Sequence, residues 1–206
     1  MVSKLRFSSR PSCIILPLKK YPILFWQPRP DFLKLLESSQ LGKILLIFFN
    51  YVIWFFFLYL SILLVGHDPN IFWQLLAATV MAEVVERLIK KKVYWRRPMF
   101  VRHDATPVGL VDKWYQSGAF PSGHTIKATF FFLFLMLYPV FDYRLYLIVV
   151  FPLIFFRVLI GFHYPIDILG GILIGFLMWL SSFKVIAPSI VSQFIKTIYD
   201  FVFSRL

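Results

Sequence analysis

The segment from Ile44 to Val65 contains 22 consecutive residues without a charged side chain. A helix needs about 20 mainly apolar residues to cross the hydrocarbon core of a bilayer. The composition of the whole chain agrees, since 59% of its 206 residues are hydrophobic, 16% are charged and the mean hydropathy is +0.74. Soluble domains contain about 45–50% apolar and about 25% charged residues. The sequence therefore predicts a chain that folds within a membrane.

Four more apolar segments of helical length follow: Ile71–Ile89, the Phe-rich stretch after His124 that runs to Phe141, Leu145–Gly161 and Ile166–Phe183. Together with the first segment they predict an all-α, polytopic membrane helix bundle with five transmembrane helices. Near the C-terminus, one helical face carries four apolar side chains, those of Ile190, Phe194, Ile198 and Phe201. This pattern favours an interfacial amphipathic helix, and the alternative is a sixth transmembrane helix.

The predicted bundle leaves a short segment at each end of the chain. Residues 1–42 are basic, and Pro30–Leu41 has the spacing of an amphipathic helix that lies on the membrane. No cleavable signal peptide is expected, because prolines and lysines interrupt the apolar residues of Cys13–Trp26. We therefore predict an interfacial N-terminal segment (1–42), a transmembrane core (43–186) and a C-terminal amphipathic helix or sixth span (187–206).

The formal net charge of +12 could indicate a nucleic-acid partner. In a chain this apolar, basic side chains are better explained by lipid phosphates and by orientation in the bilayer, so no nucleic-acid partner is expected. Of the 22 Lys and Arg residues, 8 fall in residues 1–43 and 7 in residues 90–113. With five transmembrane helices, both groups lie on one side of the membrane. The single cysteine, Cys13, excludes an internal disulfide.

The first of three polar clusters follows the second apolar segment and contains Lys90 and Arg97. These residues are seven apart, so on a continued helix they would project from the same face. Cations at this position are also typical of residues that anchor helix ends at the membrane surface. In the same helix, Glu83 with Arg87 and Glu86 with Lys90 have the spacing of i,i+4 ion pairs.

The second cluster is Phe120–Pro121–Ser122–Gly123–His124–Thr125, directly before the Phe-rich segment. Ser122 is placed to cap that helix, whose first backbone N–H groups have no helical partner. Gly123 allows a ligand to approach those groups, and a helix N-terminus of this kind favours an anion such as phosphate. His124 would lie in the first turn, able to donate a proton to a leaving oxygen. The alternative is an ordinary capped helix.

The third cluster contains Arg157, His163 and Asp167. Pro165 suits the first position of a helix, which places His163 at the helix mouth and Asp167 on the same side. The carboxylate can accept the second imidazole N–H and so orient a nucleophilic histidine. A charge such as Arg157 within an apolar span costs at least ~2.5 kcal/mol, so it indicates a functional site. The alternative is a structural Arg157–Asp167 ion pair.

The predicted topology brings the three clusters to the same side of the membrane. Alternating helix directions put one set of residues at one end of the bundle: Lys90, Arg97, Ser122, Gly123, His124, Arg157, His163 and Asp167. Three unrelated structural features would not require this coincidence. We therefore interpret the clusters as parts of one phosphate-binding site.

These residues resemble the signature of the type-2 phosphatidic acid phosphatase superfamily. The family pattern is Lys-x6-Arg-Pro, then Pro-Ser-Gly-His, then Ser-Arg-x5-His-x3-Asp. It corresponds here to Lys90–Pro98, Pro121–His124 and Arg157–Asp167, within a resemblance that covers about residues 83–180. One position departs, because Phe156 stands where the family usually has Ser. This departure is expected to alter the strength of phosphate binding rather than the chemistry.

The resemblance implies a membrane enzyme that hydrolyses a lipid phosphate monoester or diphosphate through a phosphohistidine at His163. Asp167 would orient His163, and His124 would protonate the leaving oxygen. The implied phosphate ligands are Lys90, Arg97, Ser122, Gly123 and Arg157. No cofactor is expected, and no metal, because the histidines lack a compact spacing with carboxylates. Candidate substrates are polyprenyl diphosphate, phosphatidylglycerol phosphate and phosphatidic acid, with a polyprenyl diphosphate favoured by the short chain.

Two other functions fit parts of the pattern. One is a phosphatase of a soluble phosphate ester, and the other is a transporter or non-catalytic phosphate-binding protein of the membrane. The position of the charges at helix ends, rather than at mid-membrane, favours the enzyme. The concentration of basic residues on the site's side favours a cytoplasmic site by the positive-inside rule. The family resemblance implies an extracytoplasmic site in a multi-pass cell-membrane protein, which is the side we expect.

Overall fold

The computed structural model describes residues 21–27, 35–36, 38–92, 94–101, 118–185 and 188–203. Most of the predicted interfacial segment 1–42, with Cys13, lies outside these residues, as does most of the loop between Lys91 and Ser122, with His103. The described part of the chain is helical and contains no strand, in agreement with the predicted all-α class. Its elements are α2 (Gln40–His67), α3 (Ile71–Lys91), α4 (Pro98–Val101), α5 (Gly123–Leu137), α6 (Tyr143–Leu159), α7 (Pro165–Ser182) and α8 (Ser189–Phe203).

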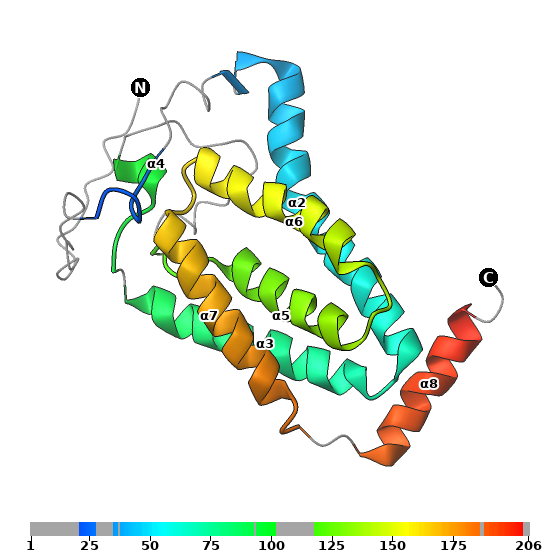
Figure 1. The fold of residues 1–206 in the computed structure, drawn as a ribbon. Helices are drawn as coiled ribbons and strands as arrows, with labels where there is room; N and C mark the ends of the chain where they lie inside the picture. The colour runs from blue at the N-terminus through cyan, green and yellow to red at the C-terminus, as the bar shows by residue number, and fades with distance from the viewer. Residues whose placement is uncertain are drawn as a thin grey trace, which may run out of the picture.

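Helix α5 lies inside the bundle and packs against α2, α3, α6 and α7 (Figure 1). The apolar core between these helices includes Phe57 and Phe131, whose rings stack with centroids 4.8 Å apart. Two glycines permit the close approach of α7 to α5. A β-carbon at Gly171 would lie 2.7 Å from Cβ of Thr125, and one at Gly175 would lie 2.5 Å from the Ile126 carbonyl oxygen. Small residues at i and i+4 are a common way for helices to pack closely in membranes.

Among the described residues, two helices, α2 and α7, are long and apolar enough to cross a membrane. Helix α5 is apolar but has 15 residues, α6 has 17 residues, and α3 carries charged residues in its last turns. Many large apolar side chains on the outside of the bundle are exposed, among them Phe55, Phe151 and Leu173. A surface of this kind indicates contact with lipid or another apolar partner. The predicted number of five spans stays a prediction.

The helix boundaries differ from the predicted ones at two places. Helix α5 ends at Leu137 rather than Phe141, because Pro139 follows and the chain turns before Asp142 caps α6. Helix α3 ends at Lys91, so Arg97 does not lie on a continued helix with Lys90. The proposal that these two side chains share a helical face was therefore wrong, and Arg97 reaches the site from the segment before α4.

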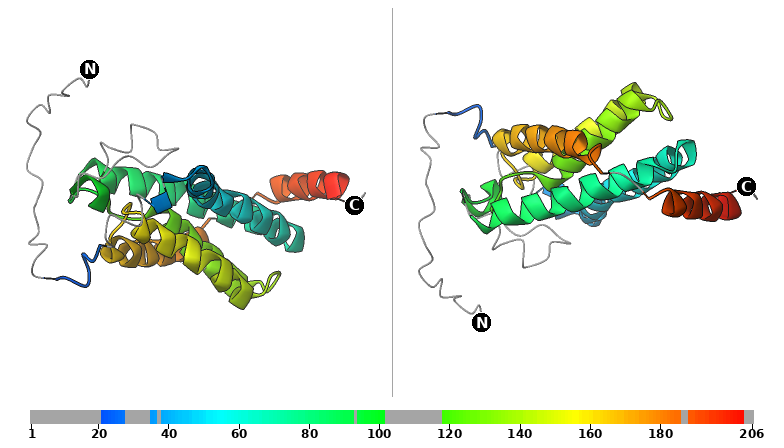
Figure 2. Two further views of the ribbon diagram at one scale, coloured as in Figure 1. Left: turned by 90° about the horizontal axis from the view of Figure 1, so that it is seen from above. Right: turned by 90° about the horizontal axis from the view of Figure 1, so that it is seen from below.

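Helix α8 lies at the end of the bundle opposite to α4, as two views show (Figures 1 and 2). Tyr199 of α8 contacts the end of α2, where its hydroxyl occupies the space that a β-carbon at Gly66 would need. Ile190, Phe194 and Phe201 are exposed on its other side. The interfacial position of this helix stays a prediction.

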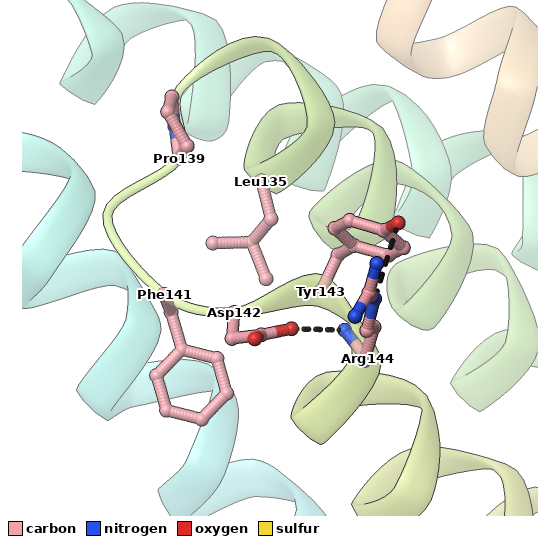
Figure 3. Close-up of a pocket in the computed structure, with 6 residues that line it drawn as sticks. All are labelled: Leu135, Pro139, Phe141, Asp142, Tyr143 and Arg144. Atoms are coloured by element: carbon pink, nitrogen blue, oxygen red, sulfur yellow. Dashed lines mark hydrogen bonds between the residues drawn. The ribbon is translucent and has the colours of Figure 1, made fainter.

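A surface pocket lies at the α5–α6 turn (Figure 3). His124 lies at the other end of α5. Its lining comprises Leu135, Pro139, Phe141, Asp142, Tyr143 and Arg144. The Asp142 carboxylate accepts a hydrogen bond from the backbone N–H of Arg144 at 2.7 Å, which is the capping contact of α6. Fifteen helical residues span about 22 Å, so this pocket is remote from the predicted phosphate site.

Candidate active site

The predicted site residues lie where α3 and α6 end and where α5 and α7 begin. Tyr164 precedes Pro165, the first residue of α7, as the sequence predicted. The backbone N–H of Ser122 donates to the carbonyl of Asp167 at 3.1 Å, which joins the start of α5 to the start of α7. The second and third clusters therefore lie side by side.

His163 and Asp167 face each other across the first turn of α7. Nδ1 of His163 lies 3.4 Å from Oδ2 of Asp167, longer than a normal hydrogen bond, and both side chains are buried. Two other donors hold the carboxylate in place. The backbone N–H of Tyr164 donates to Oδ2 at 2.7 Å, and the indole N–H of Trp95 donates to Oδ1 at 2.9 Å. Nδ1 makes no hydrogen bond within the described residues, and Nε2 is the imidazole nitrogen on the side of the ring away from Asp167.

The pKa of His163 lies well below its ordinary value of 6.5. Burial is the largest cause, followed by the positive charges of Arg97, Lys90 and Arg157, while a hydrogen bond with the Ala119 backbone acts in the opposite direction. The imidazole is therefore neutral near pH 7 in the unliganded site. A neutral imidazole has the free electron pair that a nucleophile requires.

Arg157 is buried in the last turn of α6, and two backbone hydrogen bonds close the end of this helix. The N–H of Phe162 donates to the carbonyl of Arg157 at 2.9 Å, and that of Gly161 donates to Val158 at 3.1 Å. Gly161 has φ of 82°, as the Schellman motif requires. This motif reverses the chain between Arg157 and His163.

The guanidinium of Arg157 binds α2, a helix outside the predicted motifs. One of its nitrogens donates to the backbone carbonyl of Asn50 at 3.1 Å and to the Asn50 side-chain oxygen at 2.8 Å. Nε of Arg157 is buried without a hydrogen-bond partner among the described residues. These contacts do not support the alternative of a structural ion pair between Arg157 and Asp167. Arg157 is held by Asn50 instead, and its Nε–H remains without a hydrogen-bond partner among the described residues.

Lys90 and Arg97 reach the site from the end of α3 and the segment after it. Nζ of Lys90 lies 2.5 Å from Oε1 of Glu86, and a nitrogen of Arg97 donates to the carbonyl of Phe162 at 3.4 Å. Burial lowers the pKa of Arg97 below its ordinary value, while the charges of Asp167 and Glu86 act in the opposite direction. Both cations are thus close to the negative groups of the site.

Ser122 is the N-cap residue of α5, but its side chain does not make the capping bond that the sequence suggested. Its hydroxyl oxygen instead accepts a hydrogen bond from the Thr125 hydroxyl at 2.9 Å. The backbone N–H of Ile126 donates to the Ser122 carbonyl at 3.0 Å and begins the helical pattern. Gly123, His124 and Thr125 therefore present the first N–H groups of α5, the kind of group that binds anions.

His124 lies under an aromatic residue of α2. The rings of Trp54 and His124 are 4.9 Å apart at 64°, and Nε2 of His124 is buried without a hydrogen-bond partner in the described part of the chain. Nζ of Lys127 lies 5.3 Å from the centroid of the same indole. Lys127 is buried and paired with Glu83 at 3.5 Å and Glu86 at 3.6 Å.

Sequence analysis gave no role to three residues of this site: Asn50, Trp54 and Trp95. Asn50 had a signal, because it is a lone amide within an uncharged apolar segment, where a polar side chain usually has a partner. Trp95 lies between Lys90 and Arg97, but its sequence position gives no indication that it contacts Asp167. Phe156, which stands in place of the family's Ser, packs on Phe49 with centroids 5.0 Å apart. No group of three or more potential metal ligands occurs among the described residues.

A family model described as the PAP2 superfamily matches residues 71–190 of the chain. No curated protein and no solved structure matches it. The matched range contains all eight predicted site residues and excludes α2, which supplies Asn50 and Trp54. Since the match covers more than half of the 206 residues, the chain belongs to the PAP2 superfamily, the phosphatases whose signature its three clusters resemble.

Proposed function

We propose that the protein is a multi-pass membrane phosphatase that hydrolyses a lipid phosphate monoester or diphosphate through a phosphohistidine intermediate. The observation that carries this proposal is the buried His163–Asp167 pair beside Arg97, Lys90 and Arg157. This arrangement combines a neutral nucleophile with the positive charge that a transferred phosphoryl group requires. The exposed apolar helices around it favour a substrate that approaches from the bilayer.

In the proposed first step, Nε2 of His163 attacks phosphorus and the bond from phosphorus to the leaving oxygen breaks. His124 donates a proton to that oxygen, and Asp167 stabilises the charged imidazole. Lys90, Arg97 and Arg157 neutralise the phosphoryl oxygens, assisted by Ser122 and by the N–H groups of Gly123 and His124. In the second step, water attacks the phosphohistidine and His124 accepts its proton. Inorganic phosphate is released and His163 is restored. This route assigns no step to a metal ion.

The candidate substrates are polyprenyl diphosphate, phosphatidylglycerol phosphate and phosphatidic acid, because all three present the same cleaved group on an apolar chain. We propose that the protein resides in the cell membrane with its active site on the extracytoplasmic face. The expected environment is therefore the bilayer itself, with a membrane lipid as substrate and no protein or nucleic-acid partner required.

The test is phosphate release by the purified, detergent-solubilised protein with EDTA present. The substrates are undecaprenyl diphosphate, phosphatidylglycerol phosphate, phosphatidic acid and glucose 6-phosphate. We expect release from at least one lipid, its loss in His163→Ala, and acid-labile labelling of the wild type by a ³²P-labelled substrate. Cleavage of glucose 6-phosphate alone would replace the lipid with a soluble ester. Absence of release from all four would contradict the proposal.

A further inference from the structure

Glu86 is a carboxylate at the centre of the cationic site, and the proposed reaction gives it no role. Its side chain has 15% relative exposure and lies 2.5 Å from Nζ of Lys90 and 3.6 Å from Nζ of Lys127. The negative charge of Glu86 also interacts electrostatically with Arg97 and Arg157. A phosphoryl group bound by the same cations would be repelled by this carboxylate, because like charges a few ångströms apart in a buried site interact strongly.

The carboxylate also lies against the first residue of α5. A β-carbon added at Gly123 would collide with both carboxylate oxygens and the carboxyl carbon of Glu86. Gly123 begins α5, and a negative group is stabilised beside the first N–H groups of a helix. Glu86 therefore occupies the place where the Pro-Ser-Gly-His segment would receive phosphate. A side chain at position 123 would displace the Glu86 carboxylate from this place.

We propose that Glu86 is an internal anion that occupies the phosphate position of the empty enzyme and competes with the phosphoryl group. Substrate binding displaces the carboxylate from Lys90 and the start of α5. After hydrolysis, return of the carboxylate weakens the hold of Lys90, Arg97 and Arg157 on inorganic phosphate and speeds its release. When no substrate is bound, the negative charge of Glu86 thereby balances part of the positive charge in the buried site. This inference rests on the proposed phosphate site.

Glu83 provides a matched control on the same helix. It lies one turn before Glu86 and also pairs with Lys127, at 3.5 Å, but its side chain is 45% exposed and its shorter contact, 2.8 Å, is with Arg87. Glu83→Gln changes the net charge of the protein by the same amount as Glu86→Gln. Only Glu86 contacts both Lys90 and the start of α5 in the described residues.

The experiment measures inorganic phosphate binding to the full chain in detergent by calorimetry, and phosphate as a competitive inhibitor of turnover. Wild type, Glu86→Gln and Glu83→Gln are compared. We expect Glu86→Gln to bind phosphate at least about tenfold tighter than wild type, and Glu83→Gln to stay within about twofold. We also expect Glu86→Gln without phosphate to unfold at a lower temperature, and added phosphate to raise that temperature more than in wild type.

Phosphate binding by wild type with equal or weaker binding by Glu86→Gln would overturn the inference alone. An equal gain in Glu83→Gln would also overturn it, because the effect would then reflect net charge. No binding by wild type and both variants would overturn the proposed phosphate site and the inference together. If Glu86→Gln does not fold, Glu86→Asp takes its place, since its shorter side chain keeps the charge but withdraws it from Gly123. Tighter phosphate binding than wild type is expected, and equal binding would contradict the inference.

Discussion

At the scale of single residues, Asp167 depends on two donors that the family signature does not contain. Trp95 supplies one of them through its indole N–H, 2.9 Å from Oδ1. A hydrogen bond to a charged group contributes about 1.5–3 kcal/mol, so its loss leaves the carboxylate less well oriented toward His163. We predict that Trp95→Phe lowers kcat/KM by about tenfold while the aromatic contacts with Phe25 and Phe120 persist.

Steady-state kinetics on the identified substrate would check this prediction, with Asp167→Asn as the reference for complete loss of the carboxylate. Asp167→Asn should reduce turnover by several orders of magnitude, because the amide favours the wrong imidazole tautomer. Phosphate affinity should change little in Trp95→Phe. A variant as active as wild type would show that the indole has only a packing role.

The environment of His163 leads to a prediction about pH. The reaction uses neutral imidazole, and burial with the nearby charges of Arg97, Lys90 and Arg157 holds the pKa of this group well below 6.5. As pH falls, activity is lost only when His163 becomes protonated, so a lowered pKa moves that loss to lower pH. The acid limb of kcat/KM, which reports the free enzyme, should therefore have its midpoint below about 6.5.

Arg97→Gln provides the control for this pH dependence, because Arg97 is the largest of the three charge effects on His163. Removing the positive charge should raise the midpoint of the acid limb while lowering the maximum rate. The pH at the midpoint of the acid limb can be measured even when the maximum kcat/KM is lower. An acid limb that stays in place, or that moves to lower pH, would contradict the proposed identity of the nucleophile.

The residues proposed to carry the chemistry were identified from sequence, whereas the contacts that hold them in place could not be. The spacing of Arg157, His163 and Asp167 follows from one helix end and one helix start, which are local features. Asn50 is 107 residues from Arg157, and Trp95 is 72 residues from Asp167. Contacts at such separations depend on how whole helices pack, and a single sequence gives no measure of that.

At the scale of elements, the turn between α6 and α7 determines how Arg157 and His163 face the same site. Gly161 at φ of 82° allows the Schellman bonds that close this turn. A side chain in the left-handed region costs about 1–2 kcal/mol. We predict that Gly161→Ala lowers the free energy of unfolding by about that amount and reduces kcat, because His163 lies two residues later.

Thermal unfolding in detergent, together with the activity assay, would measure both effects. Gly161→Asn is the matched variant, since asparagine enters the left-handed region more readily than alanine. It should retain more stability and activity than Gly161→Ala. Equal losses in both variants would indicate that the space around residue 161, rather than its backbone conformation, sets the requirement for glycine.

The apolar lengths and caps in the sequence predicted helix positions closely, with errors at connections. Pro165 identified the start of α7, and the Ser122 region identified the start of α5. The continued helix through Arg97 was wrong, because α3 ends at Lys91 within a run of three lysines that has no apolar face. Helix ends are determined by capping contacts and by packing, which hydrophobic periodicity does not contain.

At the scale of the whole molecule, two sequence features favour opposite orientations in the membrane. The basic residues of segments 1–43 and 90–113 favour a cytoplasmic active site by the positive-inside rule. Two of these charges, Lys90 and Arg97, lie in the site itself, however, where contacts with Glu86 and Phe162 place them. The family resemblance favours the opposite, extracytoplasmic side. Charges required by chemistry carry less information on topology, so we predict an extracytoplasmic site.

Cysteine labelling in intact cells tests this orientation. In a Cys13→Ser background, Lys92→Cys places a thiol beside the site, and Asn70→Cys places one at the α2–α3 turn, at the other end of α3. Both positions are exposed. We expect a membrane-impermeant maleimide to label Lys92→Cys in whole cells and Asn70→Cys only after lysis, because α3 is proposed to cross the bilayer between them. The reverse pattern would place the site in the cytoplasm. Labelling of both variants in whole cells would contradict a transmembrane α3, and with it the bundle of five spans on which the lipid substrate depends.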